Sequence, residues 1–175
     1  MNGIDIAPDG SVTITEHVKE LVYDIQNKAH LTGRSRESEG TRNYESASDM
    51  KANDDEDSLY QIKRSLSTAF ATLTSLLGEY ISATDTVSGN LLYENIDAEG
   101  ELAISLKVPS NYNRAALESM AKNIHAYLVD MSLGEWFAIT DKEDAELYIT
   151  KAGTDMENVR VSLYRRVRPE RPSYV

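Results

Sequence analysis

The clearest pattern in the chain is a run of apolar residues that recurs at alternating three- and four-residue intervals between residues 56 and 82. The positions that share this spacing are Leu59, Ile62, Leu66, Ala69, Leu73, Leu76 and Tyr80. Such spacing places apolar side chains on one face of an α-helix. Because Phe70, Leu77 and Ile81 widen the stripe beyond a two-stranded seam, we expect this helix to pack in a bundle rather than in a free coiled coil.

A second helix is predicted at 13–30. Thr13 and Glu16 have the spacing of a capping box, in which the threonine hydroxyl and the glutamate each satisfy a free backbone N–H. The apolar residues that follow at helical intervals are Val18, Leu21, Val22, Ile25 and Ala29. Before them, Ile4 and Ile6 alternate with polar residues, which is typical of a short edge strand or docking arm, or of a frayed terminus.

Two further helices are predicted at 111–136 and 141–167, and they should meet at a corner. The core of this corner is predicted to be Trp136, Phe137 and Thr140. Thr140 and Glu143 again have capping-box spacing, so the threonine is expected to cap the second helix of the pair. The two aromatic rings supply a large apolar area with which to wedge the helices together, and Gly134 just before the corner should let the helices approach closely. The apolar residues expected to form the buried face of the last helix are Ala145, Ile149, Ala152, Met156, Val159 and Leu163.

A β-hairpin is predicted at 91–108, between the second and third helices. Its second strand alternates strictly, with Leu102, Ile104 and Leu106 on one face. A lone hairpin is marginal in water, so this apolar face must be covered. It packs either on the helices of its own chain or on a neighbouring subunit, and the three residues are therefore subunit-interface candidates.

Residues 33–57 are predicted to form a flexible insert, because they lack any apolar period and are rich in serine, asparagine and charge. The insert is either a solvated linker or a segment that becomes ordered against a neighbouring subunit. The tail at 168–175 is predicted to be extended, because it contains two prolines. The basic residues of this end are further subunit-interface candidates, and they are Arg165, Arg166, Arg168 and Arg171.

These basic residues contrast with the rest of the chain. The 175 residues carry a net charge of −11, which argues against a groove for nucleic acid as the main function. Arginines near a helix end also suit the helix dipole, and that is the simplest explanation for them. An extended basic segment on an acidic body is also complementary to a second copy, which we favour over nucleic-acid binding.

The sequence contains no recognisable catalytic chemistry. It has no cysteine, which excludes disulfides and thiolate metal sites, and its three histidines lack metal-ligand spacing. No phosphate-binding loop, dinucleotide fingerprint or nucleophile elbow occurs. His125 lies beside Ile124 on a predicted helix, where it fits the boundary between the buried and exposed faces better than the role of a catalytic base. We therefore expect no enzyme, no cofactor and no metal, and the absence of a long apolar run argues against a membrane partner.

The sequence thus predicts a mainly α fold in one domain at 1–175. Four helices form a bundle-like core, a β-hairpin joins the second and third, and a flexible insert and an extended C-terminal arm project from it. The N-terminal residues have no basic and apolar regions of the kind that make a signal peptide.

Three segments resemble small virion proteins from the structural gene clusters of tailed phages and prophages of gut anaerobes. They are 106–112 (LKVPSNY), 134–140 (GEWFAIT) and 163–169 (LYRRVRP). In size and in the order helix, hairpin, helix, the chain is also similar to head–tail connector (adaptor) proteins of the phage neck. This resemblance implies a helical body without catalytic residues that assembles as a homo-oligomeric ring.

The same resemblance implies the portal protein and tail or neck proteins as partners, in a virion assembled in the host cytoplasm. Contact with DNA would be at most non-specific, in the lumen of the ring. The alternative is a cytosolic helical adaptor or regulatory protein-binding module, and the third hypothesis is an enzyme whose site is assembled only in space.

Overall fold

The structure is a computed structural model, and it describes residues 3–7, 10–38, 51–52, 55–81 and 100–169. In this part the protein is mainly helical, with four α-helices and a small antiparallel sheet. The helices are α1 (Val18–Ser38), α3 (Glu56–Leu76), α4 (Leu117–Thr140) and α5 (Lys142–Leu163), with short 3₁₀ turns η1 (Gly78–Tyr80) and η2 (Arg114–Ala116). The strands are β1 (Gly3–Ile6), β2 (Ser11–His17) and β3 (Glu101–Lys107).

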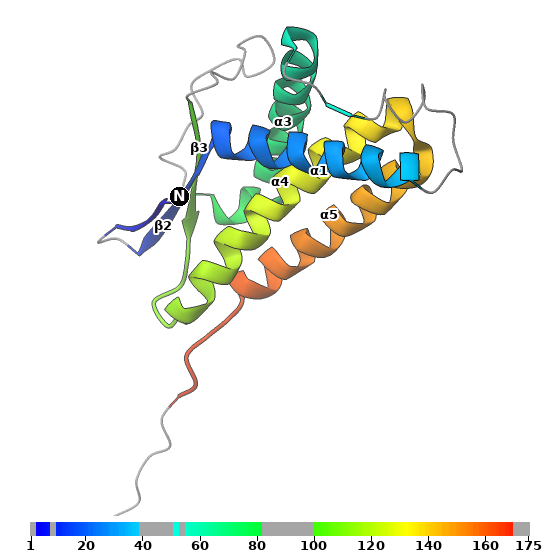
Figure 1. The fold of residues 1–175 in the computed structure, drawn as a ribbon. Helices are drawn as coiled ribbons and strands as arrows, with labels where there is room; N and C mark the ends of the chain where they lie inside the picture. Colours follow the sequence, from blue (N-terminus) through cyan, green and yellow to red (C-terminus); the bar gives the residue numbers. More distant parts are fainter. Residues whose placement is uncertain (1–2, 8–9, 39–50, 53–54, 82–99, 170–175) are drawn as a thin grey trace, which may run out of the picture.

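Figure 1 shows the sheet at one side of the molecule and the helices extending away from it. α4 and α5 lie side by side as an antiparallel pair, and α1 crosses over them. The chain leaves the end of α5 close to the start of α4. Strand β2 runs directly into α1, so the sheet and the helical layer share a continuous segment.

The sheet has the order β1-β2-β3, and both strand pairs are antiparallel. Along β2 and β3, successive residues point alternately to the inner, buried face and to the outer face, as in a half-buried strand. The cross-strand pairs on the inner face are Val12–Leu106, Ile14–Ile104 and Glu16–Leu102. Ile6 and Ile4 pair with Val12 and Ile14 and therefore lie on this same face. However, both isoleucines are 38% exposed, because β1 extends past the cover that the helices provide.

The predicted helix start at Thr13 is wrong, because residues 11–17 form strand β2. Thr13 contacts Ser105 on β3 through their hydroxyl oxygens, which are 2.8 Å apart, and caps nothing. The segment SVTITEH is rich in β-branched residues, which favour a pleated surface, and its inner positions alternate in burial. The helix therefore begins at Val18 and continues to Ser38, into the region predicted to be a flexible insert.

The predicted apolar stripes are largely confirmed as the core. The buried residues from these stripes, in α1, in α3 and at the residue that follows α3, are Val18, Leu21, Val22, Ile25, Ala29, Ile62, Leu66, Ala69, Phe70, Leu73 and Leu77. Leu76 is an exception and is exposed. In α5, Tyr148 is buried in place of the predicted Ile149, because the helix turns its tyrosine toward Phe137, and the two rings stack 5.4 Å apart.

The corner between the last two helices is present, but its details differ from the prediction. α4 continues through Trp136 to Thr140, and the side chain of Asp141 caps α5 by accepting from the Glu143 N–H at 2.9 Å. Thr140 is therefore the end of one helix and not the cap of the next. Phe137 is fully buried, while Trp136 packs partly buried against the core.

Close packing of α4 against α5 depends on Gly134. A Cβ atom at this position would lie 2.7 Å from Cγ1 of Ile149 on the facing helix, which is closer than such atoms approach. The absence of a side chain lets the two backbones come together. The predicted close approach of helices at Gly134 is thus confirmed.

The other predicted segments have mixed outcomes. Strand β3 is confirmed, but it pairs with β2, while its predicted hairpin partner at 91–96 lies outside the described residues. Of the insert at 33–57, residues 33–38 belong to α1, and 39–50 and 53–54 are outside the description. The helices predicted at 56–82 and 111–136 are found at Glu56–Leu76 and Leu117–Thr140.

We expect Phe137→Ala to lower the free energy of unfolding by about 3–5 kcal/mol, because it empties a fully buried site and removes the stack on Tyr148. Ile139→Ala is the matched control, since this side chain is 76% exposed and should change stability by less than about 0.5 kcal/mol. Urea denaturation followed by Trp136 fluorescence measures both. Equal effects of the two substitutions would contradict this picture of the corner.

Candidate functional site

An open groove lies between the turn that joins β1 to β2 and the segment that leads from β3 to α4. Its volume is about 270 Å³, and it is lined by Ile6, Gly10, Val12, Val108, Pro109, Ser110, Tyr112, Arg114 and Leu117. Gly10 adopts φ +86°, a left-handed conformation that suits glycine at this turn. The groove is therefore a continuation of the core that the helices leave uncovered.

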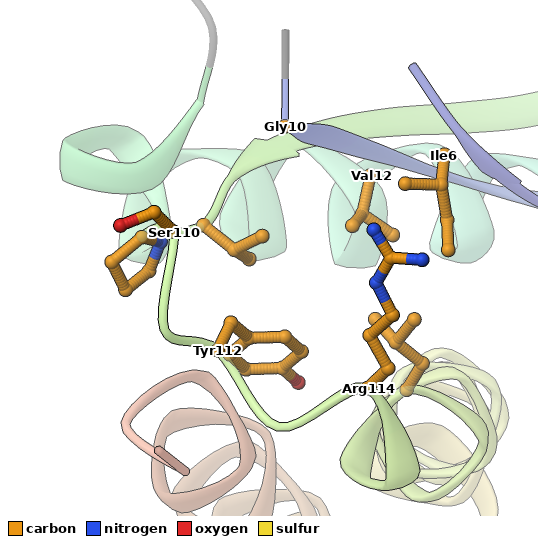
Figure 2. Close-up of a pocket in the computed structure, with 9 residues that line it drawn as sticks. Ile6, Gly10, Val12, Ser110, Tyr112 and Arg114 are labelled. Atoms are coloured by element: carbon orange, nitrogen blue, oxygen red, sulfur yellow. The ribbon is translucent and has the colours of Figure 1, made fainter. Parts of the chain in front are cut away.

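Tyr112 is the most unusual residue of the groove. Its side chain is 6% exposed, and its hydroxyl has no hydrogen-bond partner among the described residues. Figure 2 shows the ring lying under the sheet with its hydroxyl end toward the Arg114 side chain. A buried hydroxyl without a partner costs free energy, because folding removes its water without replacing the bond.

Burial raises the pKa of the Tyr112 hydroxyl above its ordinary value of 10.0, and the nearby positive charge of Arg166 partly opposes this rise. The hydroxyl is thus a neutral O–H group near pH 7. It is therefore a buried hydrogen-bond donor that has no acceptor among the described residues.

Arg114 supplies the charge of the groove. Its side chain extends from η2 up toward Ile6 and Val12 (Figure 2). In the part of the chain that the structure describes, no carboxylate forms an ion pair with it. A guanidinium offers planar, forked donors that match a carboxylate. The groove thus combines an apolar floor with two donors, an arrangement suited to an acidic group that carries an apolar neighbour.

The basic segment after α5 lies beside this groove. The N–H of Val167 donates to the Asn111 carbonyl at 2.9 Å, and the N–H of Asn113 donates to the Arg165 carbonyl at 3.1 Å. Tyr112 and Arg166 form an antiparallel bridge between these two segments. The first residues after α5 are therefore held against their own chain, while the side chains of Arg165, Arg166 and Arg168 are exposed.

A second polar cluster centres on His125 of α4. Its Nδ1 lies 2.8 Å from a carboxylate oxygen of Glu16 on β2, and its Nε2 lies 2.9 Å from one of Asp24 on α1. Both ring nitrogens can donate to the two carboxylates only when the ring is protonated, so this arrangement favours the positively charged imidazolium. The hydrogen bond to Glu16 raises the pKa of His125 above 6.5, burial opposes this rise, and the bond to Asp24 adds to it.

This cluster fits a structural role. Glu16 is buried, and a buried carboxylate needs a partner of opposite charge or strong hydrogen bonds. His125 supplies such a partner and so ties β2, α1 and α4 together. The sequence placed His125 on a helix beside Ile124, at the boundary between its buried and exposed faces, and there it lies. The two carboxylates that hold it come from segments about a hundred residues away and gave no signal.

The predicted interface residues fall into two groups. Leu102, Ile104 and Leu106 are buried against the core of their own chain, so these side chains are not exposed for contact with a neighbour. Their prediction as interface residues is thus wrong, and the alternative of packing within the chain is the one observed. Arg165, Arg166 and Arg168 are exposed, and Arg171 lies outside the described residues.

Trp136, Phe137 and Thr140, the predicted corner core, lie at the end of α4 that adjoins α5. The groove is formed by the other end of α4, so the corner takes no part in it. The sequence gave no direct sign of the groove, although its alternating Ile4 and Ile6 indicated that the first residues could form an edge strand. In the described ranges, no group of three or more histidine, cysteine or acidic residues could hold a metal ion.

We expect the unfolding free energy to fall as pH rises above about 6.5, because folded His125 keeps its proton where the unfolded chain has lost it. The stabilisation is complete below that pH and is lost through the folded pKa. Urea denaturation between about pH 6 and about pH 8.5 measures this slope. His125→Asn should remove it, whereas the exposed control His30→Asn should keep it. A slope that survives in His125→Asn would contradict the assignment.

We expect Tyr112→Phe to leave the unfolding free energy unchanged or to raise it by up to about 1–3 kcal/mol, because the substitution removes a hydroxyl that folding leaves without a partner. Chemical denaturation of the isolated chain measures the change. A loss of more than about 1 kcal/mol would mean that the hydroxyl has a partner in the free protein.

Comparison with protein-family models finds no match to this chain, and comparisons with curated proteins and with solved structures find none either. No helix among the described residues is both long and apolar enough to cross a membrane.

Proposed function

We propose that this protein is a structural component of the virion neck of a tailed phage, a head–tail connector that assembles as a ring between portal and tail. The proposal begins from the three segments that resemble virion proteins. The structural observation that supports it is a gathering of contact-forming features at one end of the molecule. These are the edge strand β1, the open groove and the exposed arginines that follow α5.

The edge strand offers backbone groups for pairing. Among the described residues, β1 has a neighbour only on its β2 side. An edge strand of this kind readily pairs with a strand from another chain, and soluble proteins usually protect such edges. Here Ile4 and Ile6 add apolar side chains that the helices leave partly exposed. Both features are suited to contact with a neighbouring subunit.

The charges are suited to the same purpose. Arg165, Arg166 and Arg168 are exposed on a chain whose net charge is −11. Charges of opposite sign on different faces of one molecule attract successive copies and fix their orientation. Contacts between two different faces are heterologous, and they produce a closed ring when the rotation between copies closes.

In this proposal the four helices act as one bundle-like body, and the projecting parts make the contacts. The partners are further copies of the chain, the portal protein and the tail or neck proteins. A predominantly acidic ring would repel DNA from its lumen, so any DNA contact would be non-specific. The runner-up is a cytosolic helical adaptor, which would bind its partner as a single copy.

The test is assembly of the purified chain with the portal protein of the same phage. We expect size-exclusion chromatography with light scattering to show several copies of the chain on each portal ring, and electron microscopy to show an added ring at the tail-facing side. Replacing Arg165, Arg166 and Arg168 by glutamate should weaken this binding, since opposite charges become like charges. The exposed Lys142→Glu is the control.

A chain that stays monomeric at all concentrations and does not bind the portal would overturn the proposal. A one-to-one complex with a bacterial protein, formed in place of the ring, would favour the cytosolic adaptor.

A further inference from the structure

The groove lacks two kinds of group that its lining residues require. The Tyr112 hydroxyl has no hydrogen-bond acceptor among the described residues, and the exposed Arg114 has no carboxylate partner there. Ile6 and Val108 of the lining are partly exposed and would gain from an apolar neighbour. An occupant must therefore present a carboxylate and a large apolar side chain next to each other. A free inorganic anion would satisfy the two donors but would leave Ile6 and Val108 of the lining partly exposed to water.

The first turn of α3 presents this combination. Asp55, Glu56 and Asp57 are exposed there, and Tyr60 is 51% exposed. Residues three and four positions apart share one face of a helix, so Tyr60 lies on the same face as Asp57 and Glu56. The turn is thus an acidic surface with one projecting aromatic ring.

We propose that the groove is the acceptor half of a contact between copies, and that it receives the acidic first turn of α3 from the next copy. This inference rests on the proposed ring and supplies one of its contacts. The Tyr60 ring enters the groove, and the carboxylates of Glu56 and Asp57 pair with Arg114. The Tyr112 hydroxyl donates to one of the oxygen atoms brought in by the turn.

The dimensions agree with this occupant. A cavity of about 270 Å³ holds the liquid volume of roughly nine water molecules, which is room for one aromatic side chain. A guanidinium lying over an aromatic ring also gains cation–π attraction. The ion pair with Arg114 and the cation–π contact both become stronger when water leaves the groove, because the local dielectric constant falls.

The two surfaces lie at opposite ends of α3, so a chain cannot fill its own groove. Ile81, just beyond the C-terminal end of α3, pairs with Leu106 at the end of β3, and the groove begins directly after that strand. The acidic turn is at the other end of a 21-residue helix, about 32 Å away. The contact is therefore between copies, and it joins the groove of one copy to the first turn of α3 of the next.

The other candidate occupant within the chain is the segment that follows α5. Its charges come mainly from Arg165, Arg166 and Arg168, and like charges would oppose its entry beside Arg114. The acidic turn of α3 carries the opposite sign and is therefore the occupant that the charges favour.

The test is a charge-reversal experiment with two variants of the full chain. Arg114→Glu reverses the groove, and the double variant Glu56→Lys with Asp57→Lys reverses the turn. Each variant alone should lose self-association at least tenfold in sedimentation velocity or in assembly on portal rings, because like charges then face each other. An equimolar mixture should recover association, since each groove then meets a turn of opposite charge in an alternating order.

The controls are Lys142→Glu and Glu146→Lys, which reverse exposed charges on α5 and should associate like the natural chain. A second measurement uses the absence of natural cysteines. Chains with Ser110→Cys and chains with Glu56→Cys, mixed under oxidation, should form a disulfide-linked heterodimer. Ala138 is exposed near the corner between α4 and α5. Chains with Ala138→Cys should therefore not form a disulfide-linked heterodimer with Ser110→Cys chains.

Tyr112→Phe gives a separate readout. It should weaken association several-fold while leaving the isolated chain at least as stable, a pair of effects that damage to the fold would not produce. Equal stability and equal association would show that the hydroxyl takes no part in the contact and would count against the inference.

The outcomes separate this contact from the neck role. If natural rings form on the portal and both charge-reversal variants assemble normally, the groove contact is overturned while the ring stands. If only Arg114→Glu is impaired and mixing restores nothing, the groove has another occupant and the inference is wrong. If the natural chain neither self-associates nor binds the portal, the ring and the contact fail together.

Discussion

A row of charged contacts along α1 fixes the arrangement of this molecule. Asp24, Lys28 and Arg36 of α1 meet, in order, His125 and Asp130 of α4 and Asp144 of α5, at 2.6 to 2.9 Å. Asp130 and Asp144 are buried, and a buried carboxylate that loses its partner costs far more than the pair contributes. The row therefore selects one register of α1 against the other helices. Because β2 continues into α1, this register also sets the position of the sheet.

The position of the sheet decides what remains open. β2 and β3 place their apolar residues in the core, while β1 extends past the helices and leaves Ile4 and Ile6 partly uncovered. The segment between β3 and α4 must cross the same end to reach the helical layer, and it brings Tyr112 and Arg114 with it. The groove is thus a consequence of the way in which a small sheet meets a longer helical body.

The sequence predicted the parts of this fold that depend on local spacing. The stripes of α1 and α3 and the close approach at Gly134 follow from residues within a few turns of each other. It failed where a local signal had two meanings, as in Thr13–Glu16, where capping-box spacing coincides with a β-branched alternation that β3 converts into a strand. Thr13 meets Ser105 from 92 residues away, so the competing pairing was not visible locally. Tyr112 was named only as part of a resembling segment, because its missing hydrogen bond exists only after folding.

The curvature of any assembly built from this chain depends on the same internal contacts. A heterologous contact joins two different surfaces, and the angle between those surfaces on one subunit sets the rotation to the next. Here the two surfaces are the groove and the acidic turn, connected through α3 and the sheet. The apolar face of α3 packs in the common core, and the charged row along α1 holds the sheet and α4 that form the groove. Residues that touch no neighbour would therefore decide whether successive copies close into a ring, because they hold the two contacting surfaces at a fixed angle.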